Sequence, residues 1–245
     1  ETWAASEEIS TPLGISILTR VRDESRRFDL NNLRVKAQNG QRQPDDVLMD
    51  LLTLCGDFTP SVKVAALRDF LDADDQGTRE SEFYRRLQPP YAAVNRVLYG
   101  WGELVHVEGW GREQFVRRPR TGLPGNFDGD LVDCVTLLPL ARERPLPVNV
   151  NTATRETLTG VLGFEHDDLV NAILTFRTLK PIRSLEPLSV LVDADYFESV
   201  RPYLDVRSRV FRVDAQAFAD GRRTHVRALA VRDQQGQVSI VQWYL

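Results

Sequence analysis

The two ends of the chain alternate between apolar and polar residues, as half-buried β-strands do. Residues 14–23 place Ile17 and Val21 on one side, and residues 28–30 are expected to return as a short second strand. Near the C-terminus three further strands are predicted, over residues 210–218, 223–232 and 237–244. Asp-Gly and Gln-Gly dipeptides lie in their connections and are typical of tight hairpin turns, so these strands should form an antiparallel meander.

Between these ends the apolar residues recur at every third or fourth position, which is the spacing of amphipathic helices. One helix is expected from Asp45 to Cys55, directly after Pro44, and another after Pro60. A strand–helix–strand order lets both ends of the chain share a sheet only if the helical block is inserted between the strands. The pattern therefore predicts an α+β protein with an antiparallel sheet and a large helical insertion.

Residues 148–187 contain two short helical patterns, over about 154–162 and 167–178, joined by a tight turn at Gly163. Thr154 is expected to cap the first of them. Helix-hairpin-helix modules, which bind the phosphates of nucleic acids through backbone N–H groups, share this pattern. Here the turn carries a bulky phenylalanine and three carboxylates, which would repel a phosphate. A structural hairpin is therefore favoured, and a DNA-binding module of the competence type is the alternative.

The acidic loop over residues 71–84 follows much of the spacing of a calcium-binding loop. It has oxygen-bearing side chains at the first, third, fifth, seventh and ninth positions of that template and a glycine at the sixth. These residues are Asp72, Asp74, Gln76, Thr78, Glu80 and Gly77. The twelfth position, which in the template is a bidentate glutamate, is Phe83, and Glu82 stands next to it. The spacing fits either a weak calcium site or a solvated acidic loop.

Composition narrows the possible functions. The chain of 245 residues is 42% hydrophobic and 27% charged, as ordinary globular proteins are, and its net charge of −4 argues against a general polyanion binder. No apolar run approaches the roughly 20 residues that span a bilayer. The histidines His106, His166 and His225 lack ligand spacing, and no HExxH, GxSxG or P-loop motif occurs, so an enzyme is not expected.

The two cysteines, Cys55 and Cys134, admit one pairing, and no CxxC motif indicates a zinc or redox site. Cys55 lies on the apolar face of its predicted helix. Composition alone leaves two buried thiols and one disulfide as equal alternatives.

Five short segments carry a resemblance to a known family. They are FDLNNL at 28–33, DADD at 72–75, PPY at 89–91, GEL at 102–104 and VNVNTA at 148–153. In this order they resemble the type II secretion system protein K family, the GspK minor pseudopilins, and the resemblance extends over nearly the whole chain.

The resemblance implies a pseudopilin antiparallel sheet into which a large all-α domain of two SAM-like helical units is inserted. On this basis residues 1–35 and 201–245 are expected to form the sheet. Residues 36–147 would be the first SAM-like unit, and residues 148–200 the second.

It further implies a non-enzymatic minor pseudopilin at the tip of the type II secretion pseudopilus, where the bulky insert caps the fibre. The implied partners are the I-type and J-type minor pseudopilins, together with other pseudopilins and secreted substrates, and no nucleic acid. The implied place is the periplasmic side of the inner membrane of a Gram-negative bacterium, with the full-length protein anchored there by an N-terminal helix. Its implied role is protein export across the outer membrane.

Two sites follow from the same resemblance. The family favours calcium in the helical domain, and the matching acidic positions are Asp72, Asp74, Asp75, Glu80 and Glu82. Because the periplasm is oxidising, a disulfide between Cys55 and Cys134 is also expected.

Overall fold

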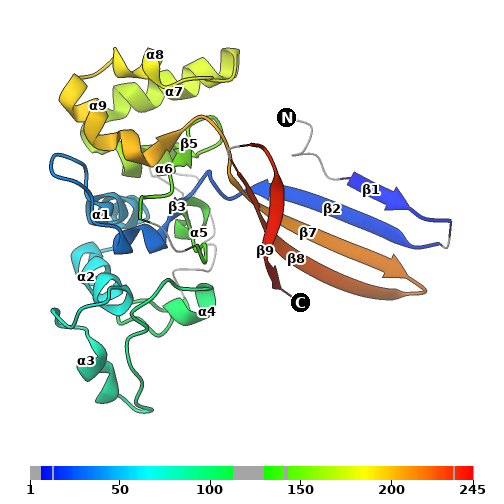
Figure 1. The fold of residues 1–245 in the computed structure, drawn as a ribbon, viewed down its shortest axis with the longest axis horizontal. Helices are drawn as coiled ribbons and strands as arrows, with labels where there is room; N and C mark the ends of the chain where they lie inside the picture. Colours follow the sequence, from blue (N-terminus) through cyan, green and yellow to red (C-terminus); the bar gives the residue numbers. More distant parts are fainter. Residues whose placement is uncertain (1–6, 13, 113–129, 141–142, 234, 245) are drawn as a thin grey trace. The chain divides into compact units, whose positions relative to one another are not determined.

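The chain folds into two compact units, and the second is inserted into the first, as the strand–helix–strand pattern predicts (Figure 1). The computed structural model describes residues 7–12, 14–112, 130–140, 143–233 and 235–244. One unit combines Glu1–Arg26 with Arg207–Leu245, and the other is Arg27–Val206. The α+β fold class is confirmed. Residues 27–35 and 201–206, which we expected in the sheet, belong to the inserted unit.

The first unit is a five-stranded antiparallel sheet in the order β1-β2-β7-β8-β9. Its strands are β1 (Glu7–Ser10), β2 (Ser16–Asp23), β7 (Val210–Ala219), β8 (Arg222–Arg232) and β9 (Val238–Tyr244). The predicted meander is confirmed. The pairing of β2 with β7, from Ser16 opposite Phe218 to Asp23 opposite Phe211, joins the two ends of the chain across the insertion.

The alternation predicted for these strands gives the sheet two different faces. One face is apolar, because Val21, Val213, Ala228 and Trp243 stand opposite one another across four strands. On the other face an arginine of β8 donates to the carboxylate of Asp214 on β7, with 2.8 Å between Arg227 Nε and Asp214 Oδ1. Arg212 and Arg227 thus lie on the polar face beside the carboxylate of Asp214.

The expected return strand at residues 28–30 is wrong in its placement. The N-terminal hairpin consists of β1 and β2, whereas β3 (Phe28–Asp29) pairs in parallel with β4 (Val135–Thr136) inside the insert. Long-range contacts decide this, since the Asp29 carboxylate accepts the backbone N–H of Leu138 at 3.2 Å. Phe28 and Asp29 are both fully buried there.

The insert is mainly helical but not entirely so. Its described α-helices are α1 (Pro44–Leu54), α2 (Pro60–Leu71), α3 (Ser81–Arg85), α4 (Trp101–Leu104), α5 (Leu131–Cys134), α6 (Arg155–Leu162), α7 (Asp167–Leu179), α8 (Glu186–Ser189) and α9 (Ala194–Val200). Besides β3 and β4 it holds a second parallel pair, β5 (Val148–Asn149) with β6 (Leu204–Asp205). None of the described helices has both the length and the apolar character that a bilayer span requires. The subdivision of the insert at residue 147 stays a prediction.

Two helices at the centre of the insert, α1 and α6, approach closely because of a glycine. A Cβ atom added at Gly160 of α6 would lie 2.4 Å from Leu51 Cδ2 of α1, which is too close for any other residue without repacking. The predicted hairpin of α6 and α7 is confirmed, and the Thr154 side chain caps α6 by accepting the N–H of Thr157 at 3.2 Å.

Two asparagines, one buried and one half-buried, link the non-helical segments of the insert. Asn31 accepts the N–H of Leu98 at 2.8 Å and donates to the carbonyls of Leu98 and Leu138 at 3.0 and 2.9 Å. Asn151 acts similarly, since it accepts the N–H of Ile182 and donates to the carbonyls of Ile182 and Val206. These two residues belong to the segments FDLNNL and VNVNTA. Their amides satisfy backbone groups that no regular secondary structure pairs.

Candidate metal centre

Three of the five predicted metal-binding residues lie together in the loop between α2 and α3. Asp72, Asp74 and Glu80 each offer a carboxylate oxygen, and these oxygens all lie within 4.8 Å of one another. Asp72 caps the end of α2, whereas Glu80 precedes α3. The loop therefore returns on itself and brings the first and ninth positions of the template close together.

Asp69, in the last turn of α2, holds this loop in place. Its Oδ2 atom accepts the backbone N–H groups of Thr78 and Arg79 at 2.9 and 2.8 Å. A Cβ atom at Gly77 would lie 2.3 Å from the carboxylate carbon of Asp69. The glycine is thus needed for close approach of a carboxylate to the loop backbone. Sequence reasoning missed Asp69, because it precedes the template and lies within a helical pattern.

The electrostatics of the cluster favour a bound cation. Glu80 is only 6% exposed, and both of its carboxylate oxygens lack a hydrogen-bond partner among the described residues, as does Oδ1 of Asp72. Burial, together with the charges of Asp69, Asp72, Asp75 and Asp74, raises the pKa of Glu80 to about 7. Burial and the charge of Asp74 also raise the pKa of Asp72. Buried carboxylates without a counter-charge are costly, so the group is incomplete without a proton or a cation.

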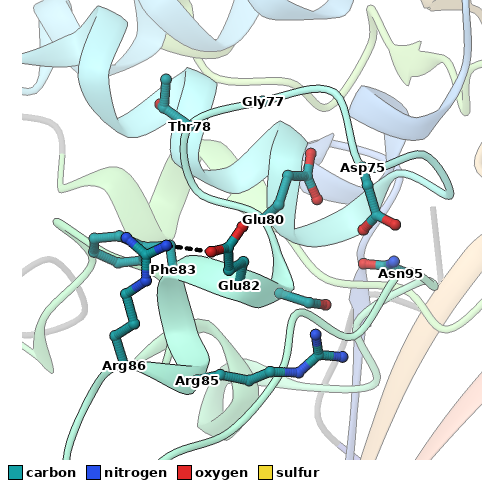
Figure 2. Close-up of a pocket in the computed structure, with 10 residues that line it drawn as sticks. Asp75, Gly77, Thr78, Glu80, Glu82, Phe83, Arg85, Arg86 and Asn95 are labelled. Atoms are coloured by element: carbon teal, nitrogen blue, oxygen red, sulfur yellow. Dashed lines mark hydrogen bonds and ion pairs between the residues drawn. The ribbon is translucent and has the colours of Figure 1, made fainter.

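A hollow of about 610 Å³ lies beside the cluster and adds two further oxygen donors (Figure 2). Asp75 and Asn95 line it, and their side chains point toward each other in Figure 2. The Oδ1 atom of Asn95 is buried without a hydrogen-bond partner among the described residues, and its backbone has a φ of +47°. Asn95 is too distant in sequence for the loop template to have found it. Glu82 differs from the others, because its exposed carboxylate pairs with Arg86 in the same view.

This donor set suits a hard divalent cation. Carboxylate and amide oxygens are the ligands that Ca²⁺ takes, whereas zinc sites use cysteine and histidine. Unpartnered buried oxygens of Asp72 and Glu80 are the observation that fits such an ion. Asp72, Asp74 and Glu80 could hold it, and Asp75 and Asn95 are the nearby donors.

The two cysteines lie side by side in the insert. Cys55 follows the last turn of α1, and Cys134 ends α5 and is fully buried. Both are thiols in this structure. A hydrogen bond with the Cys55 side chain and burial together raise the pKa of Cys134, so this sulfur is held as a thiol. Helices separated by a long stretch of sequence thus bring the predicted pair within reach of each other.

A Cys55–Cys134 disulfide is expected to form in an oxidising buffer and to raise the melting temperature. Closing so long a loop stabilises a protein by about 4 kcal/mol in the chain-entropy model, or about 10 °C for a chain of this size. Melting with and without reductant measures this shift, and Cys55→Ala serves as the control that should not respond. Equal melting of the unmodified protein under both conditions would contradict the disulfide.

The helical hairpin does not offer the features of a phosphate site. Arg155 of α6 is paired with Asp167, the first residue of α7, at 3.0 Å between Nη1 and Oδ1, and Arg42 beside the turn is paired with Asp50. Phe164 is 44% exposed at the tip. The turn therefore combines a bulky side chain with cations that already have carboxylate partners, which does not favour DNA binding.

Comparisons with known proteins agree with this architecture. Residues 26–118 match the family model described as type II secretion system (T2SS), protein K. A chain in the crystal structure of the GspK–GspI–GspJ complex from the enterotoxigenic Escherichia coli type 2 secretion system is similar in structure, with a TM-score of 0.72. The two are 18% identical, and the similarity covers 99% of this chain and 84% of that chain, which shows a shared fold. None of the curated proteins matches the sequence.

Proposed function

Because this chain belongs to the type II secretion system protein K family, as the resemblance predicted, we propose that it is the minor pseudopilin that caps the tip of the pseudopilus. The observation that carries this proposal is the large insert within a pseudopilin-like sheet. The chain leaves the sheet after β2 and re-enters it at β7. Asp23 and Phe211, which are paired, lie next to these two points. An insertion of this size makes the subunit much bulkier than a sheet alone, which supports a position where no further subunit is added.

The proposed partners are the I-type and J-type minor pseudopilins. The similar chain comes from a crystal structure of the GspK–GspI–GspJ complex, which supports a ternary complex for this protein as well. We place the complex on the periplasmic side of the inner membrane, at the pseudopilus tip, where it would support protein export across the outer membrane. Its role there is assembly and not catalysis.

Co-elution tests this proposal. The protein is mixed with the I-type and J-type subunits of the same bacterium and applied to a size-exclusion column. A single peak that contains all three chains is expected, and mixtures that lack one chain provide the controls. Independent elution of the three chains at micromolar concentration would contradict the assembly role.

Calcium is proposed as a structural ion of the insert, held by Asp72, Asp74 and Glu80. The support is the proximity of their carboxylate oxygens and the absence of hydrogen-bond partners for the buried ones among the described residues. When bound, the ion would neutralise the buried charge and fix the loop between α2 and α3. Glu82 is not a ligand in this proposal, because it is paired with Arg86.

A further inference from the structure

A groove on the inserted unit lies between the C-terminal end of α7 and the start of α8. Its volume is about 500 Å³, within the range of pockets that bind ligands. Ile182 and Leu188, both buried, form its floor, and Phe176 and Leu179 of α7 form an apolar wall. We call it the α7–α8 groove.

The apolar stripe of α7 continues beyond the core of the domain. Leu169 and Ile173 are buried, at 2% and 0% exposure. Phe176 and Leu179 follow at helical spacing on the same stripe, but they are 38% and 80% exposed. The helix therefore presents to solvent, at its C-terminal end, two apolar side chains that continue its buried stripe.

The charge at the groove is opposite to that of the whole protein. Lys180 and Arg183 line it, and no carboxylate does so among the described residues, although the chain has a net charge of −4. Neither cation forms an ion pair with a described residue. Two cations beside an apolar wall are complementary to a ligand that carries both carboxylates and bulky apolar side chains.

The walls of the groove are preformed. Pro181 and Pro187 restrict the backbone on either side of it. Arg177 fixes the end of α7 by donating to the carbonyls of Val150 and Ala153, at 3.0 and 2.6 Å. A rigid groove loses little entropy when a ligand is ordered in it, so even a short segment can bind.

We propose that the α7–α8 groove binds a short acidic peptide segment of another protein, with two bulky apolar side chains in the groove and carboxylates at Lys180 and Arg183. A concave site of this volume accommodates such side chains, whereas insertion into a lipid surface requires a protruding face. This inference goes beyond the tip-assembly role and does not depend on it.

Selection from a phage-displayed library of random dodecapeptides on the intact protein tests the proposal. Enriched sequences are expected to combine two bulky apolar residues with at least two carboxylates. The synthetic consensus peptide, labelled with fluorescein, is then titrated by anisotropy. Leu179→Glu and the double variant Lys180→Glu, Arg183→Glu should each weaken its binding by about tenfold or more.

Matched controls separate the groove from the general surface. Val190 is 80% exposed, as Leu179 is, but does not line the groove, so Val190→Glu should leave binding unchanged. The exposed pair Arg222 and Arg223 of β8 provides the charge control. Unchanged melting temperatures establish that all variants fold.

Three results would overturn the proposal. They are the absence of any enriched peptide, enrichment of basic or purely apolar peptides, and binding that Leu179→Glu does not weaken. Binding of the protein to vesicles of phosphatidylglycerol is measured as well. Binding to them that depends on Leu179, Lys180 and Arg183, without peptide binding, would assign the groove to a membrane surface instead.

Discussion

Replacing Asn31 with alanine is expected to lower the free energy of unfolding by about 4 kcal/mol, the largest effect we expect from a single side chain. Asn31 is 2% exposed, and its amide makes three hydrogen bonds to the backbone of Leu98 and Leu138. Alanine would leave the N–H and the carbonyl of Leu98 unpaired in a dry core, whereas the Leu138 carbonyl would keep the N–H of Leu140 as a partner. Each such group costs about 1–3 kcal/mol, of which relaxation of the site recovers a part.

Urea denaturation followed by circular dichroism measures the change. Asn39 lies in an exposed loop nearby, so Asn39→Ala should change stability by less than about 0.5 kcal/mol. Asn31→Asp keeps the acceptor for the Leu98 N–H but loses both donors, and it should destabilise the protein strongly although its shape is the same. A loss below about 1 kcal/mol for Asn31→Ala would show that these hydrogen bonds do not hold the segments together.

Calcium is expected to raise the melting temperature of chelator-treated protein by about 5 °C at about 10 mM, since weak sites of this type have Kd values of about 0.1–1 mM. Glu80→Gln should abolish the shift, because it removes the buried charge that the ion neutralises. The same variant should be at least as stable as the unmodified protein without calcium, since burial disfavours the ionised Glu80.

Glu82→Gln is the matched control for the calcium site. It changes the same type of residue two positions away, at an exposed ion pair with Arg86, so the calcium shift should persist. Calorimetric melting of the three proteins with calcium and with chelator makes the comparison. An equal calcium shift in Glu80→Gln and in the unmodified protein would exclude Glu80 as a ligand.

The carboxyl group of Glu80 should also make the stability of the protein depend on pH. The pKa of Glu80 in the folded protein is about 7, above its ordinary value of 4.5, so the folded state binds the proton more tightly than the unfolded state. Without calcium, the contribution of this group to stability is therefore complete below pH 4.5 and is lost as the pH rises to about 7. Because calcium and protons compete for the site, the calcium shift should grow over the same interval. A calcium shift that is constant from pH 5 to pH 7.5 would contradict this linkage.

Local periodicity in the sequence was sufficient to predict much of the architecture. Alternation identified β2, β7, β8 and β9, and helical spacing identified α1, α2 and the α6–α7 hairpin. Each of these patterns arises because one side of a helix or strand is buried. Residues close together in the sequence are enough to show which side that is. The insertion followed from the order of these elements. The acidic spacing likewise indicated Asp72, Asp74 and Glu80, whose carboxylate oxygens converge in the structure.

Tertiary structure alone decided the placement of groups whose partners are distant in sequence. Asn31 meets Leu98 and Leu138 across separations of 67 and 107 residues, and the same kind of contact draws β3 into the insert and away from the sheet. Asn95 reaches the hollow beside the acidic loop only through the fold. Phe176 continues the apolar stripe of the helix predicted over residues 167–178, but the structure leaves it partly exposed. The sequence by itself therefore determined the elements and their order. Only the packing of remote segments determined which polar groups are satisfied and which apolar surface stays uncovered, because burial at those positions depends on residues that no local pattern contains.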